Sequence, residues 1–299
     1  MKLALIYFSF FLAATKVFAT DVIDICDRGI VGEEIVKAVS AKNCSQVSKS
    51  AMEKLEYLVV VNKIIPTLKG GSFSGLSSLK SLFLDSNGIE SIEPRALDGL
   101  ENLIVLKLDR NKISRIDGSV FKNLKTLQAL DLSYNQIDEV GGLSQLQALE
   151  ELSLESNKLE KLPQLSGAES LRSLNVRKNR LIRIHGDRLK NLKSLRSIDF
   201  ENNMVADIEE FAFAQTSLVK VNFRNNQLHQ VGINWFSNLP YLRTLTLDAN
   251  MIDKVEDASF QGTGALERLE LHANPLIEIS RRRTGLSPLV HIGGVRITP

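Results

Sequence analysis

Asparagine recurs at one fixed place in nine of ten consecutive repeats of this sequence. Each of these asparagines ends the frame L-x-x-L-x-L-x-x-N, in which Leu, Ile, Val or Phe fills the apolar positions. The steps between leading leucines are 24, 24, 24, 22, 22, 24, 23, 24 and 24 residues. A period this regular predicts a solenoid whose coils pack on one another, rather than a globule around one central core. The ten leading leucines are Leu55, Leu79, Leu103, Leu127, Leu149, Leu171, Leu195, Leu218, Leu242 and Leu266.

The recurring asparagines are predicted to be structural. An asparagine amide both donates and accepts hydrogen bonds, so it can satisfy turn backbone groups that would otherwise be buried unpaired. Stacked coils would let each amide serve its own turn and the next one. The nine positions are Asn87, Asn111, Asn135, Asn157, Asn179, Asn203, Asn226, Asn250 and Asn274.

The apolar positions of the frame predict a short strand and the turn before it, both facing inward. Strands of successive coils would then lie side by side in a parallel sheet, about 4.8 Å apart. A second apolar anchor follows the asparagine by ten residues and would fill the wedge under the convex arc, where each buried group contributes roughly 1.5–3 kcal/mol. This anchor is Leu97, Phe121, Leu189, Phe213, Phe236 or Phe260, with Phe73 in the first repeat.

This pattern resembles the leucine-rich repeat family, and the 24-residue form with phenylalanine is similar to its typical extracellular subclass. The resemblance extends from Leu55 to about Leu276. It implies an α/β-type repeat solenoid: a curved horseshoe of about ten repeats over residues 55–276, with a parallel β-sheet on the concave face and mostly irregular or 3-10 convex segments. Residues 277–299 would form a C-terminal cap or tail. The inner face of such proteins usually binds another macromolecule, which is an association with the fold.

The first nineteen residues predict a secretory signal peptide. Lys2 precedes an apolar run over residues 3–14, and Val17-Phe18-Ala19 offers a small-residue cleavage site before Thr20. A run of about twelve residues is too short to span a bilayer. The alternative is an N-terminal anchor. No later stretch is long and apolar enough to cross a membrane, so we expect a secreted, extracellular protein.

Residues 20–54 are expected to form an N-terminal cap with one disulfide. The chain has two cysteines, Cys26 and Cys44, and in an exported protein such a pair is expected to be bonded. Closing this loop contributes about 3 kcal/mol on the chain-entropy account. The stapled cap would cover the apolar edge of the first coil, and residues 32–41 could form a short helix within it. Asn43-Cys44-Ser45 is a glycosylation sequon with Asn43 as acceptor, although its middle residue is the bonded cysteine.

The charge balance argues against nucleic acid as a partner. The chain has 37 basic and 35 acidic residues, and removing residues 1–19 takes away Lys2 and Lys16 and no acid. The remainder has 35 of each sign and no net charge, whereas phosphate binding requires a concentrated positive surface. The only basic cluster is Arg281-Arg282-Arg283, which is more typical of a solvated turn than of a heparin-like site.

The predicted inner face carries two groups of candidate partner-binding residues. Side chains two, four and six residues after each leading leucine should point into the concavity. The first group is apolar and suggests a contact site, unless the cap or the edge coil folds over it. The second group is charged, and the sign of the charge alternates from one coil to the next after Glu155. Each exposed ion pair of this kind would contribute about 0–1 kcal/mol to stability. This group is either a polar surface for a protein partner or a solvated face. The candidates are Tyr57, Val59, Val61, Phe83 and Val105 in the first group, and Arg177, Glu201, Arg224, Asp248 and His272 in the second.

The sequence has few residues in patterns typical of catalytic or metal-binding sites. The four histidines are scattered over different coils, and His272 near Glu270 is the only pairing on the inner face. A single pair of this kind favours a surface contact over a catalytic dyad or a metal site. No G-x-S-x-G, P-loop or H-E-x-x-H motif is present. We therefore expect no enzyme, no cofactor and no metal.

The leading functional hypothesis is a secreted recognition protein that binds another protein or a microbial surface through its inner face. Its architecture resembles short invertebrate leucine-rich immune proteins, which implies an innate-immune role. The alternatives are a matrix or cell-adhesion protein and, third, an inhibitor of a secreted enzyme. No cysteine follows Asn274-Pro275. Leu286, Leu289 and Ile292 either form a degenerate final coil or leave a sheet edge open for self-association.

Overall fold

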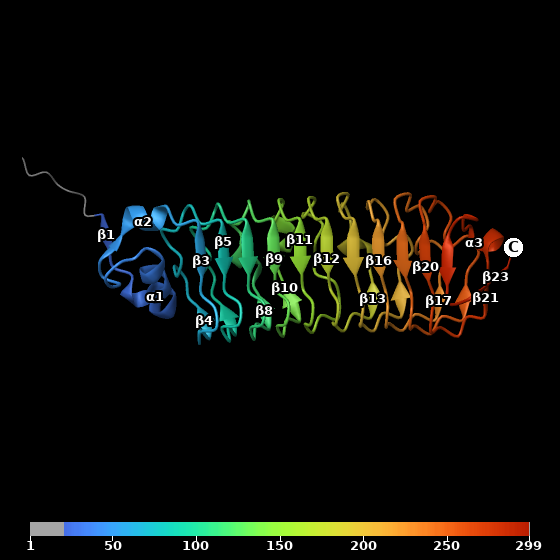
Figure 1. Ribbon diagram of the computed structural model, residues 1–299, viewed down its shortest axis with the longest axis horizontal. Helices are drawn as coiled ribbons and strands as arrows, with labels where there is room; N and C mark the ends of the chain where they lie inside the picture. Colours follow the sequence, from blue (N-terminus) through green and yellow to red (C-terminus); the bar gives the residue numbers. More distant parts are fainter. Residues whose placement is uncertain (1–20, 299) are drawn as a thin grey trace, which may run out of the picture.

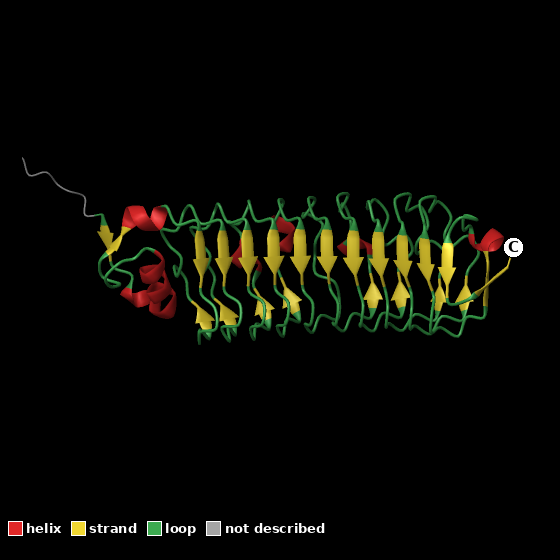
Figure 2. Ribbon diagram, viewed as in Figure 1, coloured by secondary structure: helices red, strands yellow, loops and turns green. Residues whose placement is uncertain are grey.

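The computed structural model describes residues 21–298, and its centre is one long parallel sheet (Figures 1 and 2). Eleven strands lie side by side in chain order, each parallel to its neighbours. The strands are β3 (Tyr57–Val59), β5 (Ser81–Phe83), β7 (Val105–Lys107), β9 (Ala129–Asp131), β11 (Glu151–Ser153), β12 (Ser173–Asn175), β14 (Ser197–Asp199), β16 (Lys220–Asn222), β18 (Thr244–Thr246), β20 (Arg268–Glu270) and β22 (His291–Gly293).

The repeat period sets the register of this sheet. Leu58 pairs with Leu82, and Leu82 pairs with Leu106, so equivalent residues of successive coils stand opposite each other. The central residue of each strand is buried, and its two flanking residues face the open side of the sheet. Every coil therefore adds apolar side chains to one continuous core and polar or variable side chains to one continuous surface.

In the second to the tenth coil, a repeat asparagine joins the coil to the preceding one, and all of these asparagines are buried except Asn274, which is half-buried. The Nδ2 of Asn111 donates to the carbonyl of Leu108 in its own coil and to that of Leu84 in the preceding coil, both at 2.9 Å. Its Oδ1 accepts the backbone N–H of Ile89, also in the preceding coil, at 3.0 Å. All nine repeat asparagines make this set of bonds. Besides its own coil, each asparagine therefore bonds the preceding coil. The expectation that it would bond the next coil was wrong.

Phenylalanine spacing shows why the solenoid curves. Phe200 and Phe223, next to the sheet, have ring centroids 4.5 Å apart. On the outer side, Phe213 and Phe236 are 5.9 Å apart, and Phe236 and Phe260 are 6.4 Å apart. All five rings are buried. Because the outer column is more widely spaced than the inner one, the coils fan outward and the sheet becomes the concave face.

The outer segments contain short strands and helical turns. Five pairs of short parallel strands bridge some neighbouring coils: β4 (Thr67–Leu68) with β6 (Ser91–Ile92), β8 (Arg115–Ile116) with β10 (Glu139–Val140), β13 (Arg183–Ile184) with β15 (Asp207–Ile208), β17 (Gln230–Val231) with β19 (Lys254–Val255), and β21 (Glu278–Ser280) with β23 (Arg296–Thr298). The 3-10 turns are η2 (Gly118–Phe121), η3 (Leu143–Gln145) and η4 (Gly186–Arg188). The remaining outer backbone is irregular, and the predicted fold class is confirmed.

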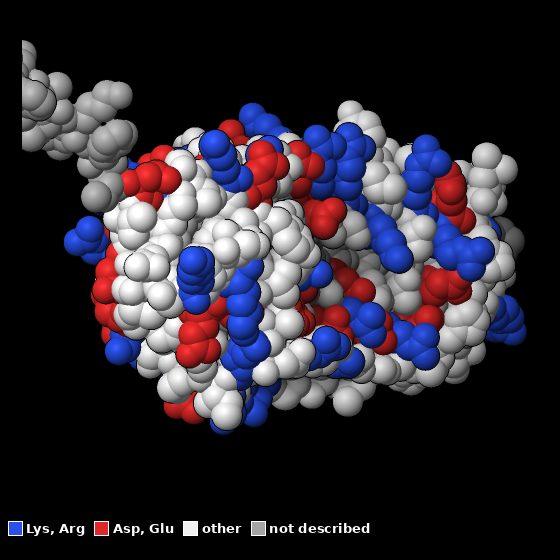
Figure 3. Space-filling view, turned by 60° about the vertical axis from the view of Figure 1, so that its left-hand side comes forward, with Lys and Arg blue, Asp and Glu red and all other residues white. Residues whose placement is uncertain are grey.

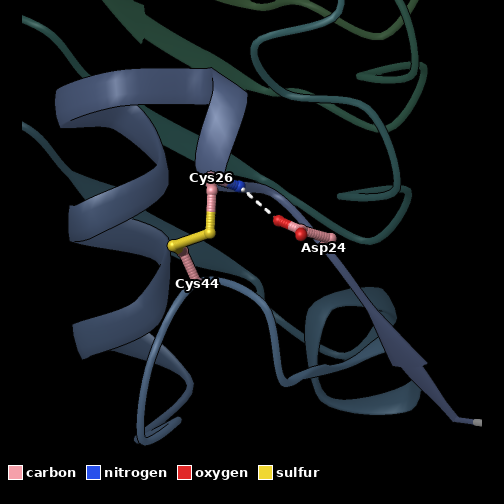
Figure 4. A group of neighbouring side chains, drawn as sticks. All are labelled: Asp24, Cys26 and Cys44. Atoms are coloured by element: carbon pink, nitrogen blue, oxygen red, sulfur yellow. Dashed lines mark hydrogen bonds between the residues drawn. A yellow bond between two sulfur atoms is a disulfide. The ribbon is translucent and has the colours of Figure 1, made fainter.

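The N-terminal cap is a small disulfide-bonded unit that covers the first coil. It contains β1 (Val22–Ile23) antiparallel to β2 (Val47–Ser48), η1 (Cys26–Arg28), α1 (Gly29–Ala38) and α2 (Lys49–Glu53). Cys26 and Cys44 are bonded, and the N–H of Cys26 donates to Asp24 Oδ1 at 2.8 Å (Figure 4). Helix α1 starts three residues before the predicted segment and contacts β3. The buried apolar side chains of the cap, which extend the repeat core, are Ile25, Val31, Ile35, Val47 and Met52.

The C-terminal end forms an eleventh coil, which is the degenerate final coil given above as one of the two alternatives. β22 pairs with β20, and the short α3 (Arg281–Thr284) precedes it. Leu286 and Ile292 are buried, whereas Leu289, at the place of the leading leucine, is 91% exposed. Arg281 donates to the carbonyls of Ser287 and Val290, so it fixes the tail. One residue of the basic cluster is therefore structural.

The expected signal peptide lies outside the described residues. Within residues 21–298, none of the helices has the length and apolar character needed to cross a bilayer. The boundaries of the cap, repeats and tail stay predictions.

We predict that Asn111→Ala lowers the free energy of unfolding by about 3 kcal/mol, because it leaves buried carbonyl and N–H groups of two coils without partners. Urea denaturation followed by circular dichroism measures this change.

Asn102→Ala is the matched control in the same coil. The Asn102 amide is exposed and donates one bond, to Ser77 O at 2.8 Å, so its loss should cost less than about 1 kcal/mol. Equal losses for the two variants would show that the buried asparagines do not hold the coils together.

Candidate functional site: the concave face

The N-terminal part of the concave face carries exposed apolar side chains. Tyr57 and Val59, from β3, are 55% and 39% exposed, so the cap does not fold over them. The Tyr57 ring lies 5.1 Å from that of Phe83 on β5, and Lys107 Nζ lies 5.7 Å from the Phe83 centroid. Val61 and Val105 are half-buried beside them. We call Tyr57, Val59, Val61, Phe83 and Val105 the apolar patch.

Three aspartates follow the apolar patch on neighbouring coils. Asp131 ends β9, and Asp85 and Asp109 lie two residues after β5 and β7. Burial raises the pKa of Asp109, and the like charges of Asp131 and Asp85 raise it further. Arg110 Nη1, 3.8 Å from Asp109 Oδ2, compensates only in part. We call Asp85, Asp109 and Asp131 the acidic group. Because the raised pKa of Asp109 means that its ionised form is disfavoured, a cationic neighbour would stabilise that form.

A shallow hollow of about 240 Å³ lies between the apolar patch and the C-terminal half of this face. Its floor is made by small side chains, including Ala129, Ser153 and Ser173, from β9, β11 and β12. Lys107, Asp131 and other polar side chains stand around it. The hollow could accept one protruding side chain of a bound molecule.

The charged column in the C-terminal half is only partly paired. It consists of Glu155, Arg177, Glu201, Arg224, Asp248 and His272. Arg177 Nη2 lies 3.2 Å from Glu201 Oε2. Asp248 Oδ1 accepts the N–H of His272 at 2.8 Å, and His272 Nδ1 lies 3.3 Å from the same oxygen. Arg224 is exposed, and no acid of the described residues lies within 4 Å of its guanidinium.

Half-buried polar groups surround Arg177. Its Nε is buried without a hydrogen-bond partner among the described residues, 3.9 Å from Asp199 Oδ2. Burial raises the pKa of Asp199. Burial also opposes ionisation of Glu155, but hydrogen bonds from Asn175 and Lys178 outweigh it and lower the pKa of Glu155. This part of the surface is a network rather than a set of separate exposed charges.

Both predicted groups therefore lie on one face, and the structure separates them by the hollow. Neither the acidic group nor Tyr134 was among the residues predicted from the sequence. The centroid of the Tyr134 ring lies 5.5 Å from Arg110 Cζ and 6.0 Å from Lys178 Nζ. Asp85 and Asp109 could have been found by extending the sixth-position column to the second and third repeats, whereas Asp131 stands at the fourth position of the next repeat. Figure 3 shows positive and negative side chains interspersed, with a broad uncharged area toward the N-terminal end.

Comparison with known families identifies the repeats. The family described as leucine rich repeat matches residues 53–113, 101–159 and 216–276, which together span more than half of the chain. No curated protein matches the sequence.

Several solved structures share the fold. An internalin, InlF, from Listeria monocytogenes superposes with a TM-score of 0.66 at 22% identity, over 94% of this chain and 81% of that chain. The leucine-rich repeat domain of APL1B gives 0.68 at 22% identity, over 83% and 71%. TLR13, in a complex with ssRNA13, gives 0.65 at 22% identity, over 85% of this chain and 46% of that chain. At these identities the likeness extends to the fold alone.

We predict that Asp109→Asn raises the free energy of unfolding at pH 7 by up to about 1 kcal/mol. The folded-state pKa of Asp109 is raised, so its ionised form opposes folding, and this penalty disappears as the pH falls through the ordinary aspartate pKa near 3.9. Urea denaturation at pH 7 and pH 3 should show the gain only at pH 7.

Asp253→Asn is the control, since this exposed carboxylate lies outside the sheet. It should change stability by less than about 0.5 kcal/mol at either pH. A loss of stability for Asp109→Asn at pH 7 would contradict the assignment.

Proposed function

Because this chain belongs to the leucine-rich repeat family, we propose that it is a secreted recognition protein that binds another protein through its concave face. The observation that carries the proposal is the apolar patch. It exposes Tyr57 and Val59 beside the half-buried Phe83, Val61 and Val105, whereas the coils from β9 to β20 carry polar or small side chains at the corresponding positions.

The apolar patch has the composition of a binding anchor. Burying an exposed aromatic side chain against a partner removes a large apolar area from water, and aromatic residues dominate the energetics of protein interfaces. The strands hold Tyr57 and Phe83 in place before binding, so little side-chain entropy is lost. An apolar side chain of the partner would pack between them or enter the neighbouring hollow.

The acidic group defines the chemistry expected next to that anchor. Asp85, Asp109 and Asp131 occupy adjacent coils and repel one another when ionised. A lysine or arginine of the partner would relieve that repulsion, which favours a protein segment with apolar and basic side chains. It disfavours nucleic acid, whose phosphates carry the same sign.

Within this function we favour an innate-immune role, with a matrix or cell-adhesion role as the alternative. The immune reading rests on the resemblance in architecture to short invertebrate leucine-rich immune proteins. Similarity in fold to APL1B and to the LRIM1/APL1C complex, the latter at 20% identity, is compatible with it. A rise in abundance after microbial challenge favours the immune role, whereas constant expression with matrix deposition favours the alternative.

The extracellular location is part of the proposal. It is supported by the signal-peptide pattern of residues 1–19 and by the disulfide between Cys26 and Cys44. Asn43 is exposed in the cap, and its Oδ1 accepts the Ser45 hydroxyl at 2.9 Å. Glycosylation of Asn43 stays a prediction.

The test uses affinity capture followed by a double substitution. The immobilised protein is exposed to extracellular fluid of its source, and the captured proteins are identified by mass spectrometry. We predict that Val59→Asp with Phe83→Asp weakens binding of the captured partner by about 30-fold or more, the usual scale for anchor residues. Surface plasmon resonance measures the affinity.

Phe211→Asp is the matched control, since Phe211 is 47% exposed but lies in the outer segment between β15 and β16. Circular dichroism checks that both variants stay folded. If Phe211→Asp weakens binding and the double variant does not, the partner binds outside the concave face.

We also propose that the C-terminal end self-associates. β22 is the last strand of the sheet, and Leu289 next to it is 91% exposed. Sedimentation velocity should show a dimer that Leu289→Asp converts to a monomer. A wild-type monomer at the highest soluble concentration would remove this part of the proposal.

A further inference from the structure

We propose that Asp248, Glu270 and His272 form a binding site for a zinc-like divalent cation on the C-terminal part of the concave face. Asp248 follows β18, Glu270 ends β20, and His272 follows two residues later. The ligand atoms that the three side chains offer lie within 4.8 Å of one another. This site goes beyond the proposed recognition function and does not depend on it.

The distances from the imidazole fit one small cation. His272 Nδ1 lies 3.3 Å from Asp248 Oδ1 and 3.3 Å from Glu270 Oε2. Two ligands bound tetrahedrally to zinc at about 2.0–2.1 Å are separated by about 3.3–3.4 Å. Small movements of the side chains would therefore place all three donors on one ion.

The surrounding residues hold two of the donors in place. Asp248 Oδ1 accepts the backbone N–H of His272 at 2.8 Å, which fixes the carboxylate against the next coil. Arg268 Nη1 lies 2.9 Å from Glu270 Oε1 and leaves Oε2 facing the imidazole. Glu270 and Asp248 side chains are 12% and 18% exposed, whereas that of His272 is 60% exposed. Such supporting contacts orient ligands and strengthen metal binding.

A glycine on the neighbouring strand supplies an independent observation. Gly293, in β22, stands opposite Glu270 in the sheet. A Cβ on Gly293 would lie 2.2 Å from Glu270 Oε2 and 2.4 Å from His272 Cε1. The two side chains thus extend into the space that a side chain of the last coil would otherwise fill, and this space brings the donors together.

The types of ligand atom in this site indicate which class of cation it would bind. One imidazole nitrogen and two carboxylate oxygens suit zinc and its neighbours in the first transition row. Calcium takes six to eight oxygen ligands, and magnesium keeps most of its own waters, so neither matches three donors that include imidazole. The exposed His272 leaves one side of the ion open, where water or a donor atom of a bound molecule would complete the coordination.

Isothermal titration calorimetry with zinc chloride tests the site on the mature protein without a histidine tag. We expect one zinc ion per chain for the wild type. Loss of the imidazole in His272→Ala should weaken zinc binding by at least about 100-fold, since even supporting contacts to a metal ligand account for about 10–100-fold. Cobalt substitution should give visible absorption bands in the wild type and none in His272→Ala.

Two further variants test whether zinc binding depends on the geometry of this site and on this histidine in particular. Gly293→Ala introduces the blocking Cβ without removing a donor, so zinc affinity should fall while the thermal unfolding curve is unchanged. His185→Ala is the matched control, because His185 Nδ1 faces a single carboxylate, Glu209, at 3.7 Å; it should leave zinc binding unaltered. The proposal is overturned if the wild type binds no zinc at submillimolar concentration, or if His272→Ala binds zinc as tightly as the wild type.

Discussion

The rest of this structure depends on the side-chain amide of one asparagine in each of the nine coils from the second to the tenth. At the end of each strand the backbone turns through the core, where unpaired carbonyl and N–H groups would be costly, and the repeat asparagine satisfies groups of two coils at once. This bonding fixes the distance and the register between coils. Register then aligns equivalent side chains into columns, so single residues become continuous surfaces on the concave face.

The repeat region could be predicted almost completely, and the chain ends only in part. Each recurrence of the frame between Leu55 and Leu276 specifies which side chains are buried, and the position of the strand in each repeat follows from this pattern of burial. The final coil lacks this frame: Leu289 occupies the leading position yet is exposed, and Val290 is buried next to it. Its strand, β22, is present because β20 offers an open edge, which is a tertiary effect that no local pattern encodes.

The sequence predicts which residues of the candidate site share the concave face, but not which of their side chains contact one another. Tyr57 and Phe83 were expected on one face, and the structure adds that their rings are in contact. The grouping of Asp248 with Glu270 and His272 depends on the direction of each side chain and on the absence of one at Gly293. These determinants lie in three successive coils, so a single repeat of the sequence could not reveal them.

The two ends of the solenoid are secured unequally. The first coil is covered by a helical unit closed by a covalent bond, whereas the last is held by a four-residue helix and by Arg281. Because each coil touches only its neighbours, disorder can enter the array at a terminus and progress one repeat at a time. Fraying should therefore be directional, starting from the carboxyl end, and amide hydrogen exchange would slow progressively toward the disulfide.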